Sequence, residues 1–123
     1  MKFELDSTRT GFIIKAYTDD SVLIGDTRHT GRVVITPEAI HTDLLPRHFS
    51  ELTAVHLDAI ARTGAEILIV GSGHQQIFLD TAIIAQMGAR GIGVEVMSNA
   101  AACRCYNVLA SEFRAVAAIL FIS

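Results

Sequence analysis

The C-terminal half of the sequence decides the fold, because short apolar runs alternate there with segments of helical periodicity. Three runs are typical of buried strands: EILIV at 66–70, IGVEVM at 92–97 and AVAAILFI at 115–122. Apolar residues at helical spacing separate them, in DTAIIAQM at 80–87 and NAAACRCYNVLASEF at 99–113. This order of strands and helices requires crossover connections, which pair strands in parallel and are almost always right-handed. The sequence therefore predicts a C-terminal βαβαβ unit.

The first third of the chain has the pattern of antiparallel β structure. Apolar runs at 12–17, 22–25 and 32–35 are separated by turn residues, among them the polar stretch at 18–21. We expect these three strands to pair with one another as an antiparallel meander.

After Pro46 the apolar spacing becomes helical and continues to Gly64. The apolar face predicted for this helix consists of Leu52, Val55, Ala59 and Ile60. Asp80, and either Ser98 or Asn99, supply side-chain oxygens suited to capping the two later helices. We therefore predict a single three-layer α/β domain over residues 1–123, with a mixed sheet, the C-terminal βαβαβ unit and the N-terminal antiparallel β meander.

Composition narrows the class of protein further. Half of the 123 residues are hydrophobic, 19% are charged and the mean hydropathy is +0.41, so the chain has ample apolar surface for one packed core. The net charge of −3 predicts no nucleic-acid partner, because phosphate backbones attract clustered Lys and Arg.

The cysteines and the apolar runs indicate a cytoplasmic protein without a transmembrane segment. Cys103 and Cys105 are too close in sequence to close an ordinary disulfide, which fits a reducing compartment. The longest apolar run, 115–122, is much shorter than the roughly 20 residues that span a bilayer as a helix. The first six residues lack the features of a secretory or organelle presequence.

A glycine turn follows the first strand of the βαβαβ unit. Gly71, Ser72 and Gly73, with His74 directly after them, stand where α/β proteins often bring backbone amides close to an anion. The turn lacks the third glycine of a dinucleotide fingerprint and the Gly-Lys of a P-loop. It is therefore either a plain turn or a niche for a small anionic or polar ligand.

The helix at 99–113 has an apolar stripe and a polar flank. The stripe predicted to face the sheet consists of Ala102, Tyr106, Leu109 and Phe113. Asn107 and Arg114 lie within roughly 20° of each other on the flank, near Cys103. Either these polar groups satisfy neighbouring backbone groups, or they form a ligand niche together with Ser72 and His74.

Nothing in the sequence singles out a catalytic residue, a metal site or a cofactor. The two cysteines fall on different faces of a helix, and the five histidines lack the spacing that holds a metal on one helical face. Glu95 stands inside an apolar strand, where we expect a structural salt bridge to an arginine.

In combination, three segments resemble those of a known family. They are 69–73, 91–97 and 102–109, with Glu112 and Arg114 after the last. The sequence is similar to the complex I assembly factor 3 family and its prokaryotic relatives of unknown function. In that family threonines usually stand where this chain has Ser72 and Cys105.

This resemblance implies a three-layer α/β fold without metal or cofactor. For the mitochondrial member it implies a non-catalytic part in assembling the respiratory NADH:ubiquinone oxidoreductase together with another assembly factor. The motif residues that it marks serve either a partner or the fold itself: Gly71, Ser72, Gly73, Glu95, Tyr106, Asn107, Glu112 and Arg114.

Two functional hypotheses follow. The first is a cytoplasmic, non-enzymatic interaction protein, an assembly or chaperone-like factor whose partner is a membrane-complex subunit or another assembly factor. Its motivation is the high apolar fraction of so small a chain, which homodimerisation would also satisfy. The second is a small anionic-ligand binder or enzyme that uses the niche of Ser72, His74, Asn107 and Arg114.

Overall fold

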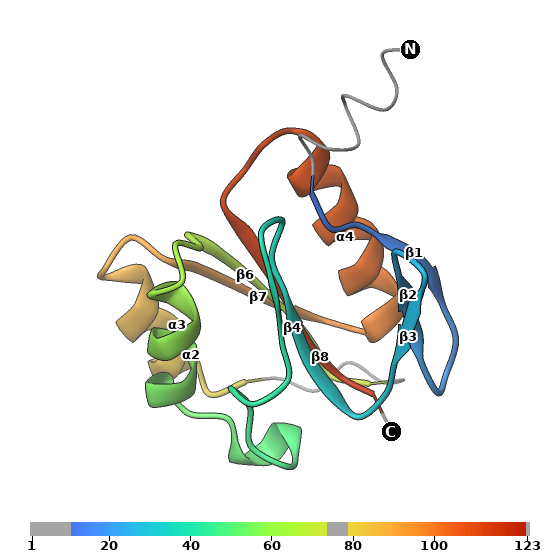
Figure 1. Ribbon diagram of the computed structural model, residues 1–123. Coiled ribbons are helices and arrows are strands. Elements are labelled where there is room, and N and C mark those ends of the chain that lie inside the picture. The colour runs from blue at the N-terminus through green and yellow to red at the C-terminus, as the bar shows by residue number, and fades with distance from the viewer. Residues whose placement is uncertain (1–10, 74–78, 123) are drawn as a thin grey trace.

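The computed structural model describes residues 11–73 and 79–122, which form two sheets and three α-helices (Figure 1). The larger sheet has the strand order β5-β4-β8-β6-β7. Its strands are β4 (Arg32–Ile35), β5 (Ile40–His41), β6 (Ile67–Gly71), β7 (Gly93–Met97) and β8 (Val116–Phe121). The smaller sheet is antiparallel and consists of β1 (Ile14–Tyr17), β2 (Val22–Ile24) and β3 (Thr27–His29).

The predicted βαβαβ unit is confirmed. Strand β6 pairs in parallel with β7 on one side and with β8 on the other, and the connections run through α3 (Thr81–Gly88) and α4 (Asn99–Ser111). The last strand, β8, lies at the centre of the sheet, which explains its unbroken apolar sequence: Val116 to Leu120 are all buried. On its other side β8 pairs antiparallel with β4, so the sheet is mixed.

Helices cover both faces of the larger sheet. Alternate residues of β6 point to opposite sides: Leu68 packs in a core cluster with residues of α3 and α2 (Ala54–Ala61), whereas Ile69 packs in a second cluster with Tyr106 of α4. The smaller sheet packs against the second cluster through Ile14, Val22 and Ile24. Figure 1 shows α2 and α3 on one side of the sheet, and α4 with β1–β3 on the other, which gives the predicted three-layer α/β fold.

The N-terminal meander contains a different third strand from the one predicted. Residues 27–29 complete the small sheet after β1 and β2, whereas β4, predicted as the third strand, belongs to the larger sheet. The burial pattern gives the reason. Val33, Val34 and Ile35 are all fully buried, and a strand that is buried on both faces requires a sheet covered on both faces.

Two predicted apolar faces are partly wrong. In α2 the buried residues are Leu57 and Ile60, whereas Val55 is 78% exposed. In α4 the buried face includes Ala102 and Tyr106 as predicted. Phe113, however, lies beyond the end of the helix with a φ of 60° and is 59% exposed. Once the backbone leaves the helix, helical spacing no longer assigns a side chain to a face.

The predicted helix caps are confirmed. The Asp80 carboxylate accepts a hydrogen bond from the Ala82 amide at the start of α3, at 2.9 Å. Ser98 is the cap of α4, and its hydroxyl accepts from the Ala101 amide at 3.3 Å. Asn99 is therefore not the cap residue, and its side chain forms other hydrogen bonds.

Candidate functional site

The glycine turn lies at the carboxyl end of β6, against the first turn of α4. Gly71 is the last residue of β6, and a methyl group there would overlap the Asn99 side-chain oxygen and come within 2.9 Å of Leu120 Cδ2. Only glycine allows this close approach of strand and helix. Ser72 donates from its amide and from its hydroxyl to the Met97 carbonyl, at 2.9 and 3.3 Å. The end of β7 and the start of α4 thus both contact the turn.

Asn99 joins three elements at this end of the sheet, a role that the sequence did not reveal. It is 2% exposed, and its side-chain oxygen accepts from the Gly73 amide at 3.1 Å. Its side-chain nitrogen donates to the Phe121 carbonyl at 3.0 Å, and its backbone amide donates to the Gly73 carbonyl at 2.9 Å. Buried amide groups need such partners, so Asn99 closes this end of the sheet. In the sequence, Asn99 stands out only as a possible cap residue beside Ser98.

Asn107 fastens the smaller sheet to α4. Its side-chain oxygen accepts from the Ile14 amide at 2.9 Å, and its side-chain nitrogen donates to the Ile14 carbonyl at 2.8 Å. This arrangement is the structural alternative considered for Asn107: the side chain satisfies a backbone amide and a backbone carbonyl of β1.

The residues of the predicted niche do not converge. Gly73 contacts the start of α4, Asn107 is two turns further along, and Arg114 follows the last turn and is exposed. The 13 residues of α4 place about 20 Å between the two ends of the helix. His74 lies outside the described residues. A shared niche of Ser72, Asn107 and Arg114 is therefore not formed.

The remaining motif residues divide between the core and the surface. Tyr106 is fully buried, and its hydroxyl donates to the Phe12 carbonyl at 2.7 Å; burial raises the pKa of this phenol. Glu112 is exposed at the end of α4. Glu95 is exposed on the edge strand β7, and no arginine of the described residues forms the ion pair predicted for it. An edge strand lets its charged side chain reach water.

Burial also raises the pKa of two groups near the start of α4, Cys103 and Tyr17. The Cys103 thiol is 5% exposed, and burial raises its pKa to about 11, although the nearby Arg104 acts in the opposite direction. Burial, followed by the charge of Asp19, raises the pKa of Tyr17. A protonated thiol is a poor nucleophile, so the raised pKa of Cys103 does not favour a nucleophilic role for this residue.

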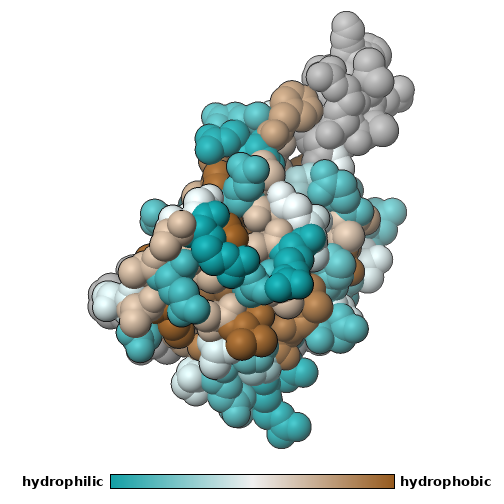
Figure 2. Space-filling view, turned by 90° about the vertical axis from the view of Figure 1, so that its left-hand side faces the viewer, coloured by the Kyte–Doolittle hydropathy of each residue, from teal (hydrophilic) through white to brown (hydrophobic). Residues whose placement is uncertain are grey.

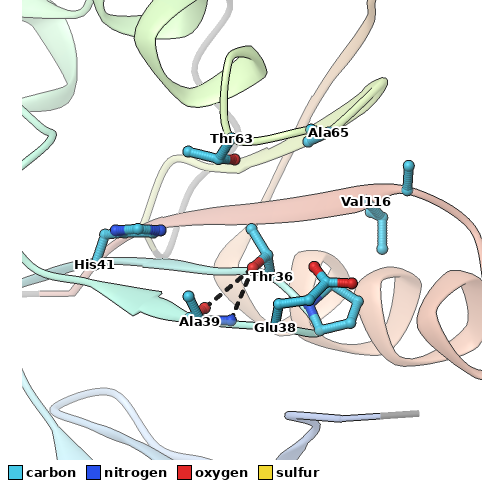
Figure 3. Close-up of a pocket in the computed structure, with 10 residues that line it drawn as sticks. Thr36, Glu38, Ala39, His41, Thr63, Ala65 and Val116 are labelled. Carbon is cyan, nitrogen blue, oxygen red and sulfur yellow. Dashed lines mark hydrogen bonds between the residues drawn. The ribbon is translucent and has the colours of Figure 1, made fainter. Parts of the chain in front are cut away.

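A cavity opens at the opposite end of the larger sheet, where β6 and β8 begin and β4 ends (Figure 3). Its volume is about 390 Å³. Figure 3 shows Thr63 and Ala65 on one side and Thr36 and Glu38 on the other, with His41 at one end. Both threonine hydroxyls donate to backbone carbonyls, of Ile60 and of Ala39. Glu38 and His41 are thus the ionisable side chains that line this cavity.

A second cavity, of about 640 Å³, lies on the side of α2 and α3. It is lined by the 3-10 helix at 49–51 and the start of α3, with these residues: His48, Phe49, Ser50, Leu52, Leu79, Asp80 and Ile83. Figure 2 shows this face of the molecule, where hydrophobic side chains gather in the middle and hydrophilic ones surround them. The lining is mainly apolar, and the Asp80 carboxylate is already occupied by the cap of α3.

The described residues offer no arrangement for a metal. Within residues 11–73 and 79–122, no three His, Cys, Asp or Glu side chains lie close enough together to hold an ion. In the same part of the chain, no helix has the length and apolar character to cross a bilayer.

The fold and these contacts define a small three-layer α/β protein in which Gly71, Asn99 and Asn107 hold the layers together. Residues 14–121 match a family described as "Protein of unknown function (DUF498/DUF598)". The chain belongs to the DUF498 family.

Curated relatives connect this family with assembly factors. The chain is 31% identical over 124 residues to NADH dehydrogenase (ubiquinone) 1 alpha subcomplex assembly factor 3 of Xenopus tropicalis, with 97% of this chain and 65% of the relative covered. It is 38% identical over 65 residues to the "13 kDa major membrane protein" of Francisella tularensis, with 53% of each protein covered. The chain thus spans about half to two thirds of the length of these relatives. The resemblance to the assembly factor 3 family is confirmed.

A solved structure supports the fold. The crystal structure of a Bordetella parapertussis protein superposes with a TM-score of 0.83 at 29% identity, over 91% of this chain and 96% of that one. The same strands and helices thus recur in a bacterial relative.

Proposed function

We propose that this chain is a non-enzymatic interaction protein that acts in the cytoplasm as an assembly factor for a respiratory or other membrane complex. The observation that carries the proposal is the similarity to assembly factor 3 of Xenopus tropicalis, which extends over 97% of this chain. The partners would be a subunit of the complex or another assembly factor.

The contacts that the motif residues make agree with this proposal. Gly71, Ser72, Asn107 and Tyr106 direct their contacts inward, to backbone groups or to packed side chains. Residues that hold a scaffold together leave the outer surface free for protein partners. We do not propose an anionic-ligand niche, because Asn107 and Arg114 do not lie at the glycine turn.

Deletion of the gene in its own organism tests the proposal. The expected result is accumulation of a partly assembled membrane complex on native gels, with restoration by the tagged wild-type chain. The same tagged chain, purified and analysed by mass spectrometry, is expected to bring down a subunit of that complex or an assembly factor.

Two controls make the test specific. A strain that expresses the tag on an unrelated cytoplasmic protein measures background capture. A chain carrying Gly71→Ala, which we expect to fold poorly, should fail to restore assembly. Unchanged levels of all respiratory and other membrane complexes in the deletion strain would contradict the proposal.

A further inference from the structure

Helix α4 turns one row of side chains outward. Arg104, Val108 and Glu112 are spaced by four residues and therefore lie one above another on the same face. Val108 stands nearly opposite the buried face of Ala102 and Tyr106, at 100° per residue. All three outward residues are exposed, and Val108 retains 56% of its accessible surface.

Exposed apolar side chains collect around this helix. Five large hydrophobic side chains of the described residues are exposed, and four of them lie on α4, directly after it or beside it: Phe12, Ile13, Val108 and Phe113. Phe12 and Ile13 run alongside the helix, because the Phe12 carbonyl accepts from Tyr106 and the backbone of Ile14 binds Asn107. Figure 1 shows the start of β1 beside α4. These residues add exposed apolar surface near α4.

The charges on this row are self-complementary. Arg104 and Glu112 each lie four residues from Val108, which is about 6 Å along the helix axis, in opposite directions. If two copies of α4 meet antiparallel with the two Val108 side chains at the symmetry axis, Arg104 of one copy is level with Glu112 of the other. The twofold axis repeats this pair, so one contact yields two ion pairs.

Among residues 11–73 and 79–122, neither charge has an ion-pair partner. The ion pairs among the described residues involve Lys15 with Asp26, and Asp58 with Arg62 and Arg90. Arg104 and Glu112 are two turns apart, too far to reach each other. Their charges are therefore available to a second molecule.

We infer that α4 is the interface of a homodimer, in which two copies pack their helices antiparallel about Val108 and exchange Arg104 and Glu112 ion pairs. A single helix pair buries little surface, so the dimer depends on protein concentration and weakens as salt screens the charges. This inference is independent of the proposed assembly function.

Charge reversal tests the pairing directly. In sedimentation velocity at low salt, the wild-type chain is expected to shift from monomer to dimer as its concentration rises. Arg104→Glu and Glu112→Arg each place like charges opposite each other and should weaken the dimer about tenfold or more. The double variant R104E/E112R restores opposite charges and should dimerise like the wild type.

Mixing the two single variants gives a second, sharper test. One then carries two glutamates on the row and the other two arginines, so the mixture should form a heterodimer that neither variant forms alone. Val55→Lys, at the exposed valine of α2, is the matched control for Val108→Lys: only the latter should abolish the dimer. Circular dichroism confirms that each variant is folded.

Three outcomes would overturn the inference. The first is a wild-type chain that stays monomeric at the highest attainable concentration. The second is a dimer that both single reversals leave intact. The third is a monomer whose α4 variants lose a heterologous partner in the pull-down, which would assign this face to another protein.

Discussion

The two ends of the larger sheet differ in how their polar groups are used. One end is formed by Gly71, Ser72, Gly73 and Asn99, and we call it the closed end. There the Asn99 side chain and the amides of Ser72 and Gly73 form hydrogen bonds with other groups of the chain. At the end formed by Thr36, Ala65 and Ala115, which we call the open end, a cavity of about 390 Å³ remains. Parallel α/β sheets usually bind ligands at the carboxyl ends of their strands. Among the described residues at that end, the Asn99 side chain and the amides of Ser72 and Gly73 instead bond to the chain itself.

The largest expected effect comes from breaking the closed end. Gly71→Ala should lower the free energy of unfolding by about 3 kcal/mol, because the new methyl group overlaps the Asn99 side-chain oxygen and crowds Leu120. Urea denaturation measures the change. Gly93→Ala is the matched control, since a methyl group there meets nothing within 4 Å, and it should stay within about 0.5 kcal/mol of the wild type.

A double-mutant cycle then tests whether Asn99 is the residue in conflict. Asn99→Ala alone should cost about 2 kcal/mol, because it leaves the Gly73 amide and the Phe121 carbonyl without their partner. Combined with Gly71→Ala it also removes the overlap, so the double variant should lose less than the sum of the two single losses. Strict additivity would show that Asn99 is not what excludes a side chain at Gly71.

Alkaline pH should destabilise the protein through Cys103, near the closed end. The pKa of this thiol is about 11 in the folded protein, against an ordinary value of 9.0, so its contribution to stability is complete below pH 9 and is lost as pH rises toward 11. The loss between pH 8.5 and pH 10.5 should be about 2 kcal/mol. In Cys103→Ala the dependence of stability on pH should become shallower over this range. An unchanged slope would mean that burial does not hold the thiol protonated.

A smaller effect separates the two residues of the predicted niche. Asn107→Ala removes both hydrogen bonds to Ile14 and should cost about 1 kcal/mol, with faster hydrogen exchange in β1. Arg114→Ala, at an exposed position after α4, should change stability by less than about 0.5 kcal/mol. Equal losses in both variants would show that Arg114 also has a structural role.

The smallest effect is expected at the open end. Ala115 is exposed and lines the cavity, so Ala115→Leu should fill space there and change the free energy of unfolding by less than about 0.5 kcal/mol. Thermal unfolding checks this. A loss comparable to that of Gly71→Ala would remove the distinction between the two ends.

Periodicity predicted those elements that are regular over their whole length. The strand at β8 and the helix at α4 were located by spacing alone, because a central parallel strand is uniformly apolar and a packed helix repeats its buried face. The strand at β4 was found as well but assigned to the wrong sheet. Its burial on both faces depends on β8, which follows it by more than 80 residues.

The candidate site was predicted less well, for a related reason. Asn107 and Arg114 share a flank of an ideal helix, but Arg114 lies beyond the point where the helix ends. Asn99 was missed as the residue that closes the sheet end, because its partners, Gly73 in the turn after β6 and Phe121 at the end of β8, come together only in the folded protein.

By itself, the sequence determined the order and type of the C-terminal elements, the parallel pairing that this order imposes, the cap at Asp80, and a second cap at either Ser98 or Asn99. These depend on local spacing and on groups a few residues apart, which a linear pattern records. Only the tertiary structure decided which sheet β4 joins, which polar side chains bond within the chain, and which helix face is exposed. Those outcomes depend on contacts between residues far apart in the chain, where hydrogen-bond geometry and steric fit select among arrangements that the sequence pattern allows equally.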